Sequence, residues 1–93
     1  MGVGKVEATL VAENTFSDAI AIRGGFNLSI SGISGDTVTL QRSFDAGANW
    51  KDVKSYTADK EDYGNESELG IQYRVGIKTG NYSAGTVVVR ISL

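Results

Sequence analysis

The chain has 93 residues, with 9 basic and 11 acidic side chains, and it contains no cysteine, histidine or proline. The missing cysteine and histidine exclude disulfides, the Ser-His-Asp and Cys-His catalytic arrangements and the commonest zinc ligands. A formal net charge of −2 offers no basic stripe for nucleic acid, and no apolar run is long enough to span a membrane. We therefore expect one domain over residues 1–93 that is not an enzyme, needs no metal or cofactor, and binds neither nucleic acid nor membrane.

Alternation of apolar and polar residues predicts strands along the chain, because a strand with one buried face has a side-chain period of two. In order, the expected strands cover residues 3–12, 19–23, 26–31, 37–43, 50–53, 70–78 and 86–93. Residues 13–18 predict a polar loop whose aromatic residue, Phe16, is a candidate partner contact. Gly24-Gly25 then permits a tight turn or a bulge before the next strand.

The fourth and fifth strands are expected to form a hairpin with a distinctive turn. Residues 43–50 read Ser-Phe-Asp-Ala-Gly-Ala-Asn-Trp and resemble the Asp-box, a hairpin motif of the form Ser-x-Asp-x-Gly-x-Thr-Trp, with Asn49 in the Thr position. Asp45 is suited to accept backbone hydrogen bonds beside Ser43, and Gly47 is suited to a positive φ. We interpret Asp45 as a turn-capping group; the alternative is a carboxylate that binds a ligand or an ion.

Two further side chains of this hairpin have predicted positions. Trp50 is large and apolar, so we expect it to plug one end of the core. Arg42 shares a strand face with Val38 and Leu40. It should therefore lie at the rim of the core, with its aliphatic stem beside an aromatic ring and its guanidinium in water, where it is a candidate partner contact.

The segment 57–69 is expected to be the longest loop, and it contains a cluster of acidic residues. The carboxylates are Asp59, Glu61, Asp62, Glu66 and Glu68. Their spacing does not match a calcium-binding loop, so we interpret them as solvated charges, with cation binding as the alternative. Tyr63 in this segment is an exposed aromatic candidate for partner contact.

The last third of the chain predicts two strands and a loop. Residues 70–78 show the strongest alternation in the sequence and should form a central strand. The loop 79–85 is rich in turn formers and carries Tyr82, another candidate contact. In the final strand Val88 lies opposite the apolar face, which suggests that a second copy covers part of the outer face.

These elements predict an all-β fold, a single antiparallel two-sheet β-sandwich of about seven strands. The turn spacing and the total length suit either an immunoglobulin-like or a jelly-roll-like sandwich. Periodicity does not distinguish the two, because both have strands with one buried face.

Five short segments in the last three quarters of the chain occur in a characteristic order. They are FNLSISG at 26–32, VTLQRSFD at 38–45 with Gly47 and Trp50 following, YR at 73–74, KTGNY at 78–82 and GTVVVR at 85–90. This order resembles a group of small tailed-bacteriophage and prophage proteins associated with virion structure. The resemblance implies a virion protein made in the cytoplasm of a bacterial host, with phage capsid or tail proteins as partners.

The sequence therefore predicts a non-enzymatic structural component of a phage particle, and specifically a capsid decoration protein that acts by protein–protein contacts, as a homo-oligomer. The alternative is a carbohydrate- or receptor-binding module of a phage tail or fibre, for which Tyr56, Tyr63, Tyr73 and Tyr82 are the available aromatics. A glycosidase that uses Asp59 and Glu66 as paired carboxylates is a third, weaker hypothesis.

Overall fold

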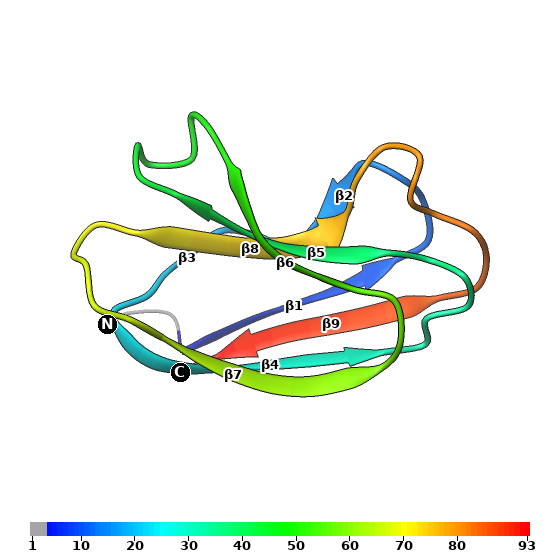
Figure 1. Ribbon diagram of the computed structural model, residues 1–93, viewed down its shortest axis with the longest axis horizontal. Coiled ribbons are helices and arrows are strands. Elements are labelled where there is room, and N and C mark those ends of the chain that lie inside the picture. The colour runs from blue at the N-terminus through cyan, green and yellow to red at the C-terminus, as the bar shows by residue number, and fades with distance from the viewer. Residues whose placement is uncertain (1–3) are drawn as a thin grey trace.

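The computed structural model describes residues 4–93, which form nine strands in two antiparallel sheets (Figure 1). The strands are β1 (Lys5–Leu10), β2 (Thr15–Phe16), β3 (Ile20–Ala21), β4 (Gly24–Ser31), β5 (Val38–Ser43), β6 (Lys51–Tyr56), β7 (Lys60–Glu66), β8 (Gln72–Ile77) and β9 (Val87–Ser92). The first sheet has the order β1-β9-β4-β7 and is the lower layer of Figure 1. The second sheet, the upper layer, has the order β2-β8-β5-β6, and β3 also pairs with β8. The predicted all-β sandwich is confirmed.

The strand order identifies the sandwich as a jelly roll. β2 and β3 pair with successive parts of β8, through Phe16 opposite Gly76 and Ile20 opposite Tyr73. Between these two pairs the edge segment has one residue more than β8 has. β2 and β3 are therefore two halves of one bulged edge strand. Counted in this way, each sheet has four strands, and the orders β1-β9-β4-β7 and β2/β3-β8-β5-β6 are those of a jelly roll.

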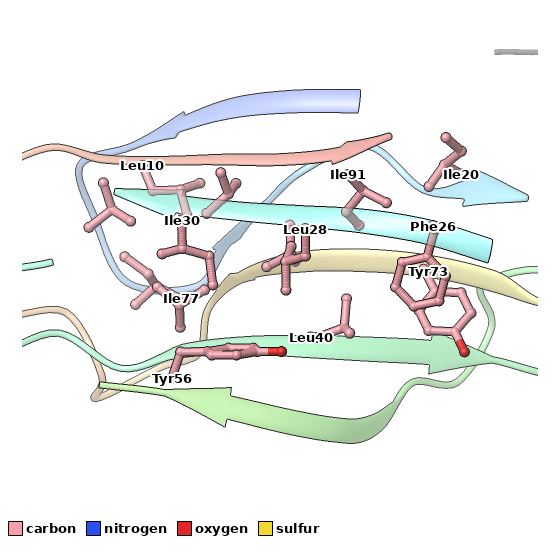
Figure 2. Packing of buried hydrophobic residues seen from close by; sticks show 14 of the residues in the cluster. Leu10, Ile20, Phe26, Leu28, Ile30, Leu40, Tyr56, Tyr73, Ile77 and Ile91 are labelled. Carbon is pink, nitrogen blue, oxygen red and sulfur yellow. The ribbon is translucent and has the colours of Figure 1, made fainter. Parts of the chain in front are cut away.

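The core lies between the two sheets and is made of alternating residues from both (Figure 2). Its members are Leu10, Ile20, Ile22, Phe26, Leu28, Ile30, Val38, Leu40, Tyr56, Ile71, Tyr73, Val75, Ile77, Val87, Val89 and Ile91. Each of these side chains is at most 7% exposed. Because the apolar positions alternate in sequence, the intervening side chains of the first sheet point to its outer face, away from the core.

Most of the predicted strands are found close to their expected positions. β8 lies inside the 70–78 prediction and occupies a central place between β2 and β5, as expected. β1 lies inside the 3–12 prediction, of which Val3 falls outside the described residues. The loop expected at 13–18 is interrupted by β2, and Gly24-Gly25 does not make a turn but begins β4, with a φ of 92° at Gly24. The chain thus has short edge elements that alternation did not reveal.

The largest error of the sequence prediction concerns β7, which lies within the segment expected to be a long loop. β7 pairs with β4 over seven residues, from Gly24 opposite Glu66 to Ile30 opposite Lys60. Its inward positions hold Asp62, Gly64 and Glu66 rather than apolar residues, so the strand has no hydrophobic alternation. Inward-pointing charges are a common feature of edge strands, where they discourage pairing with other chains.

Candidate functional site

The Asp-box-like turn is held together by its own side chains. The Ser43 hydroxyl donates to Asp45 Oδ1 at 2.8 Å and accepts the Gly47 N–H at 2.9 Å. Asp45 Oδ1 also accepts the Asn49 N–H at 2.9 Å, and Oδ2 accepts Asn49 Nδ2 at 2.7 Å. Positive φ angles at Ala46 (59°) and Gly47 (90°) allow this compact path. Both oxygens of the Asp45 carboxylate are therefore engaged within the turn.

These hydrogen bonds make the turn sensitive to acid. Three hydrogen bonds lower the pKa of Asp45 from 3.8 to about 2. In order of decreasing contribution, the donors are the Asn49 side chain, the Asn49 N–H and the Ser43 hydroxyl. A folded-state pKa below the unfolded value stabilises the fold above the unfolded pKa, and this stabilisation disappears as pH falls from 3.8 to about 2.

Asp45→Asn is therefore expected to lower stability at neutral pH and to make the loss of stability on acidification shallower. Urea unfolding at several pH values between neutral and strongly acidic measures both effects. Asn49→Ala removes the side-chain donor, which contributes most to the lowered pKa of Asp45, and should change the slope in the same direction. An unchanged acid slope in Asp45→Asn would show that the turn does not depend on this carboxylate.

Trp50 does not plug the core, contrary to the sequence prediction. It is half-buried and precedes β6, and its ring lies 4.5 Å from the Arg74 guanidinium. The same guanidinium lies 4.0 Å from the ring of Phe16, and Arg74 Nε donates to Gln41 Oε1 at 2.9 Å. Arg74 is thus enclosed between two aromatic rings, and the indole covers a cation rather than filling the interior.

Arg42 also differs from its predicted position, because its guanidinium is paired rather than solvated. Nη2 and Nε lie 2.7 Å and 3.1 Å from Glu66 Oε1, and the guanidinium carbon lies 4.7 Å from the Phe44 ring. The same Glu66 oxygen accepts the Tyr73 hydroxyl at 2.6 Å, and Oε2 accepts the Glu68 N–H at 3.1 Å. These residues form a buried polar network at one end of the sandwich.

The network determines the protonation states of its members. Burial disfavours the charged form of Glu66, but hydrogen bonds from Tyr73, the Glu68 N–H and Arg42 outweigh that penalty and lower its pKa. Burial, together with the hydrogen bond to Glu66, raises the pKa of Tyr73 to about 12. Glu66 therefore remains an anion and Tyr73 a phenol at neutral pH.

The structure does not bring Asp59 and Glu66 together as a catalytic pair. They lie just before and at the end of β7, and seven residues of extended chain span about 23 Å. Glycosidases require carboxyl groups about 5 to 9.5 Å apart. Asp59 instead accepts the Ile33 N–H at 2.9 Å. Within residues 4–93 the acidic side chains likewise form no cluster suited to a metal ion.

Asp36 is a structural residue that the sequence analysis missed. Its side chain is buried, Oδ2 accepts the Ser34 N–H at 3.0 Å, and Oδ1 accepts the N–H groups of Ser83 and Ala84. These backbone donors lower the pKa of Asp36. The neighbouring Gly and Ser residues indicate a turn, but no local signal identifies the loop some fifty residues further on that this carboxylate holds.

Only one of the three aromatic contact candidates presents its ring to solvent. Tyr63, on β7, is 83% exposed. Phe16 is half-buried beneath Arg74. Tyr82 is half-buried against the core, and its hydroxyl donates to the Gly85 carbonyl at 2.8 Å. Phe16 and Tyr82 are therefore parts of the fold, whereas Tyr63 remains available for binding.

Tyr63 stands between two hollows of the surface. One is a basin of about 390 Å³ on the outer face of the first sheet, lined by polar side chains of β4, β7 and β9. The other, which we call the slot, is a cavity of about 110 Å³ between the edge strands β6 and β7. Its walls include the buried residues Phe26, Leu28 and Leu40, and Val53, 46% exposed, lies at its mouth.

One side of the slot is closed by hydrogen bonds to Asp62. Its Oδ2 accepts the Tyr56 hydroxyl at 2.9 Å and Lys54 Nζ at 3.0 Å, and Oδ1 accepts the Tyr63 N–H at 2.8 Å. Hydrogen bonds to Asp62 lower its pKa to about 2; the Tyr63 N–H contributes most, followed by Lys54 and Tyr56. Burial, with the hydrogen bond to Asp62, raises the pKa of Tyr56. These bonds link the two edge strands beside the slot.

The described part of the chain, residues 4–93, includes no helix of the length and hydrophobicity required to cross a membrane. Comparison of the chain with known proteins found no matching family model, no matching curated protein and no matching solved structure.

Proposed function

We propose that the protein is a non-enzymatic structural component of a phage particle, located in the virion, where it decorates the capsid through protein–protein contacts. The resemblance of residues 26–93 to small virion-associated phage proteins supports a location in the phage particle. The slot between β6 and β7 supports the mode of action, and it is the observation that carries the proposal, because its lining offers named side chains for such a contact.

The slot has the features of an anchor pocket in a protein interface. Its walls are buried apolar side chains, and exposed Val53 and Tyr63 stand at its mouth. Interfaces concentrate binding energy in a few aromatic and apolar anchors that fill desolvated pockets, and Tyr is enriched among such residues. An apolar side chain on the capsid surface would fill the slot while the Tyr63 ring packs beside it.

The character of the two edge strands favours side-chain insertion over strand addition. β6 and β7 are the outermost strands on this side of the two sheets. Their exposed positions carry Lys51, Lys54 and Lys60, and charged side chains on an edge, Lys above all, oppose pairing with a further strand. The slot between them remains open to a single apolar group.

Four carboxylates are hydrogen-bonded within the fold, which supports a role without catalysis. Asp36, Asp45, Asp62 and Glu66 each accept at least three hydrogen bonds within the fold. Each has a lowered pKa. A general acid at neutral pH needs a raised pKa, so these groups are suited to structure rather than to proton transfer.

The proposal includes a homo-oligomer on the capsid lattice. Val88 is 41% exposed on the outer face of the first sheet, although it belongs to a central strand of that sheet. An apolar side chain at such a position is protected when a neighbouring copy covers it.

Val53→Asp is expected to weaken binding to purified capsids that lack the protein by at least about tenfold, because a charge would have to be desolvated at the mouth of the slot. Co-sedimentation of the variant with capsids measures this loss. Val11→Asp is the matched control, since Val11 is 57% exposed and does not line the slot. Both variants should melt at the wild-type temperature. Equal binding by the two variants would contradict the proposed contact.

A further inference from the structure

We propose that the basin on the outer face of the first sheet binds a neutral sugar, with Tyr63 as the stacking platform and Asn27, Glu61 and Arg90 as the polar contacts. This site adjoins the slot and shares Tyr63 with it, but its polar contacts belong to the basin alone. It neither requires nor follows from a capsid role, because it lies on a sheet face and not between the sheet edges.

The strand register brings the basin residues together from three distant parts of the sequence. Asn27 of β4 lies opposite Tyr63 of β7 on one side and opposite Ser92 of β9 on the other. Ser29 in the same way lies between Glu61 and Arg90. Two parallel rows of side chains therefore cross the three strands, and neighbouring strands are about 4.8 Å apart. The resulting surface is about 10 Å wide, the scale of one or two sugar rings.

The basin is hollow because short side chains lie on its middle strand and three long ones stand at its borders. Asn27 and Ser29 lie on the middle strand, whereas Tyr63 and Glu61 on one side and Arg90 on the other are longer. The volume of this open basin, about 390 Å³, falls within the range of small-molecule sites, about 300 to 1,000 Å³.

The polar groups of the basin suit hydroxyl groups, which both donate and accept hydrogen bonds. Glu61 Oε2 accepts the Ser29 hydroxyl at 2.5 Å, which fixes the carboxylate and leaves Oε1 as an acceptor. Asn27 supplies both an amide donor and an acceptor. Among the ion pairs formed by residues 4–93, none includes Arg90, so its guanidinium can donate to a ligand. A ligand with several adjacent hydroxyls satisfies all three groups.

Tyr63 provides the apolar half of sugar recognition. Its ring is 83% exposed at the border of the basin, and an aromatic ring in water is an unfavourable arrangement unless a partner covers it. The C–H face of a hexose is apolar and packs against such a ring, while its hydroxyls point to the polar groups beside it.

The charges of the basin favour a neutral sugar over an acidic one. Glu61 lies across the central strand from Arg90, and Glu7 of β1 lies opposite Arg90 on its other side. A sialic acid or uronic acid carboxylate bound at Arg90 would therefore lie near the carboxylates of Glu61 and Glu7. Because like charges repel in a partly desolvated site, acidic sugars should bind more weakly than neutral ones.

The experiment is an array of immobilised neutral and sialylated oligosaccharides probed with the full chain and four variants. We expect the wild type to bind at least one neutral oligosaccharide. Tyr63→Ala and Arg90→Ala should each weaken that binding at least about tenfold, a loss of about 1.4 kcal/mol. Arg23→Ala is the matched control, because Arg23 is an exposed arginine that does not line the basin.

The fourth variant, Val53→Asp, separates the two proposals, since it alters the slot and not the basin. It should bind the neutral oligosaccharide as the wild type does, even if capsid binding is lost or was never present. The sugar site would be overturned by an array with no neutral ligand, by a preference for sialylated glycans, or by wild-type binding in Tyr63→Ala and Arg90→Ala.

Discussion

Glu66→Ala is expected to lower the free energy of unfolding by about 3 kcal/mol, because removal of one partner leaves a buried charge uncompensated. Glu66 is 5% exposed and receives hydrogen bonds from Arg42, Tyr73 and the Glu68 N–H. Arg42 keeps 26% of its side chain exposed and can turn partly toward water. For this reason we place the loss at the lower end of the range for broken buried pairs, about 3 to 5 kcal/mol.

Urea unfolding at neutral pH measures this loss, with Glu68→Ala as the matched control. Glu68 is an exposed carboxylate two residues away, and its substitution should change stability by less than about 0.5 kcal/mol. A double-mutant cycle with Arg42→Met isolates the coupling between the two charges. Equal stabilities of Glu66→Ala and Glu68→Ala would show that the network does not stabilise the fold.

Phe26→Ala is expected to cost about 3 to 5 kcal/mol, because a large buried ring is replaced by a cavity. Phe26 is 6% exposed, and its ring centre lies 4.9 Å from that of Tyr73. It also covers Gly64 on β7, where an added Cβ would lie 2.7 Å from the Phe26 ring. Loss of the ring therefore weakens both the core and the attachment of β7, and it enlarges the slot.

Thermal and urea unfolding of Phe26→Ala, compared with Phe44→Ala, test this expectation. Phe44 is 53% exposed and touches the Arg42 guanidinium from outside, so its removal should cost about 1 kcal/mol or less. If the two variants were equally stable, Phe26 would not have the core position described for it.

The strands that sequence alone predicted are those with one apolar face. β4 and β8 alternate, β9 alternates except at Val88, and each is a central strand that packs its apolar side on the core. The alternation did not distinguish a jelly roll from an immunoglobulin-like sandwich. That choice depends on which strands are neighbours, and neighbours are set by contacts between distant segments rather than by local pattern.

β7 and Trp50 show where local pattern fails. β7 is stabilised by pairing with β4, while its inward carboxylates find partners on other strands: Asp62 binds Tyr56, and Glu66 binds Arg42. β7, in which four of the seven residues are charged, therefore forms a strand because its partners supply the apolar surface. The hydrophobicity of Trp50 predicts a core position, but its ring instead packs against the guanidinium of Arg74 on β8, two strands away from β6.

The candidate sites were only partly predictable for the same reason. Tyr63 could be singled out as an exposed aromatic residue, because it stands among charged neighbours. The basin beside it could not, since Asn27, Glu61 and Arg90 come together only through the register of β4 with β7 and β9. Register depends on the whole sheet, and a shift by one residue would place every one of these side chains on the opposite face.

The amount of this protein in purified phage particles tests the central proposal most directly. Particles would be prepared from a bacterium that carries the gene, separated into capsids and tails, and analysed by quantitative mass spectrometry. A capsid decoration protein should be present in a fixed, high ratio to the major capsid protein and should remain with the capsid fraction. Absence from intact particles, or recovery only with the tails, would contradict the proposal.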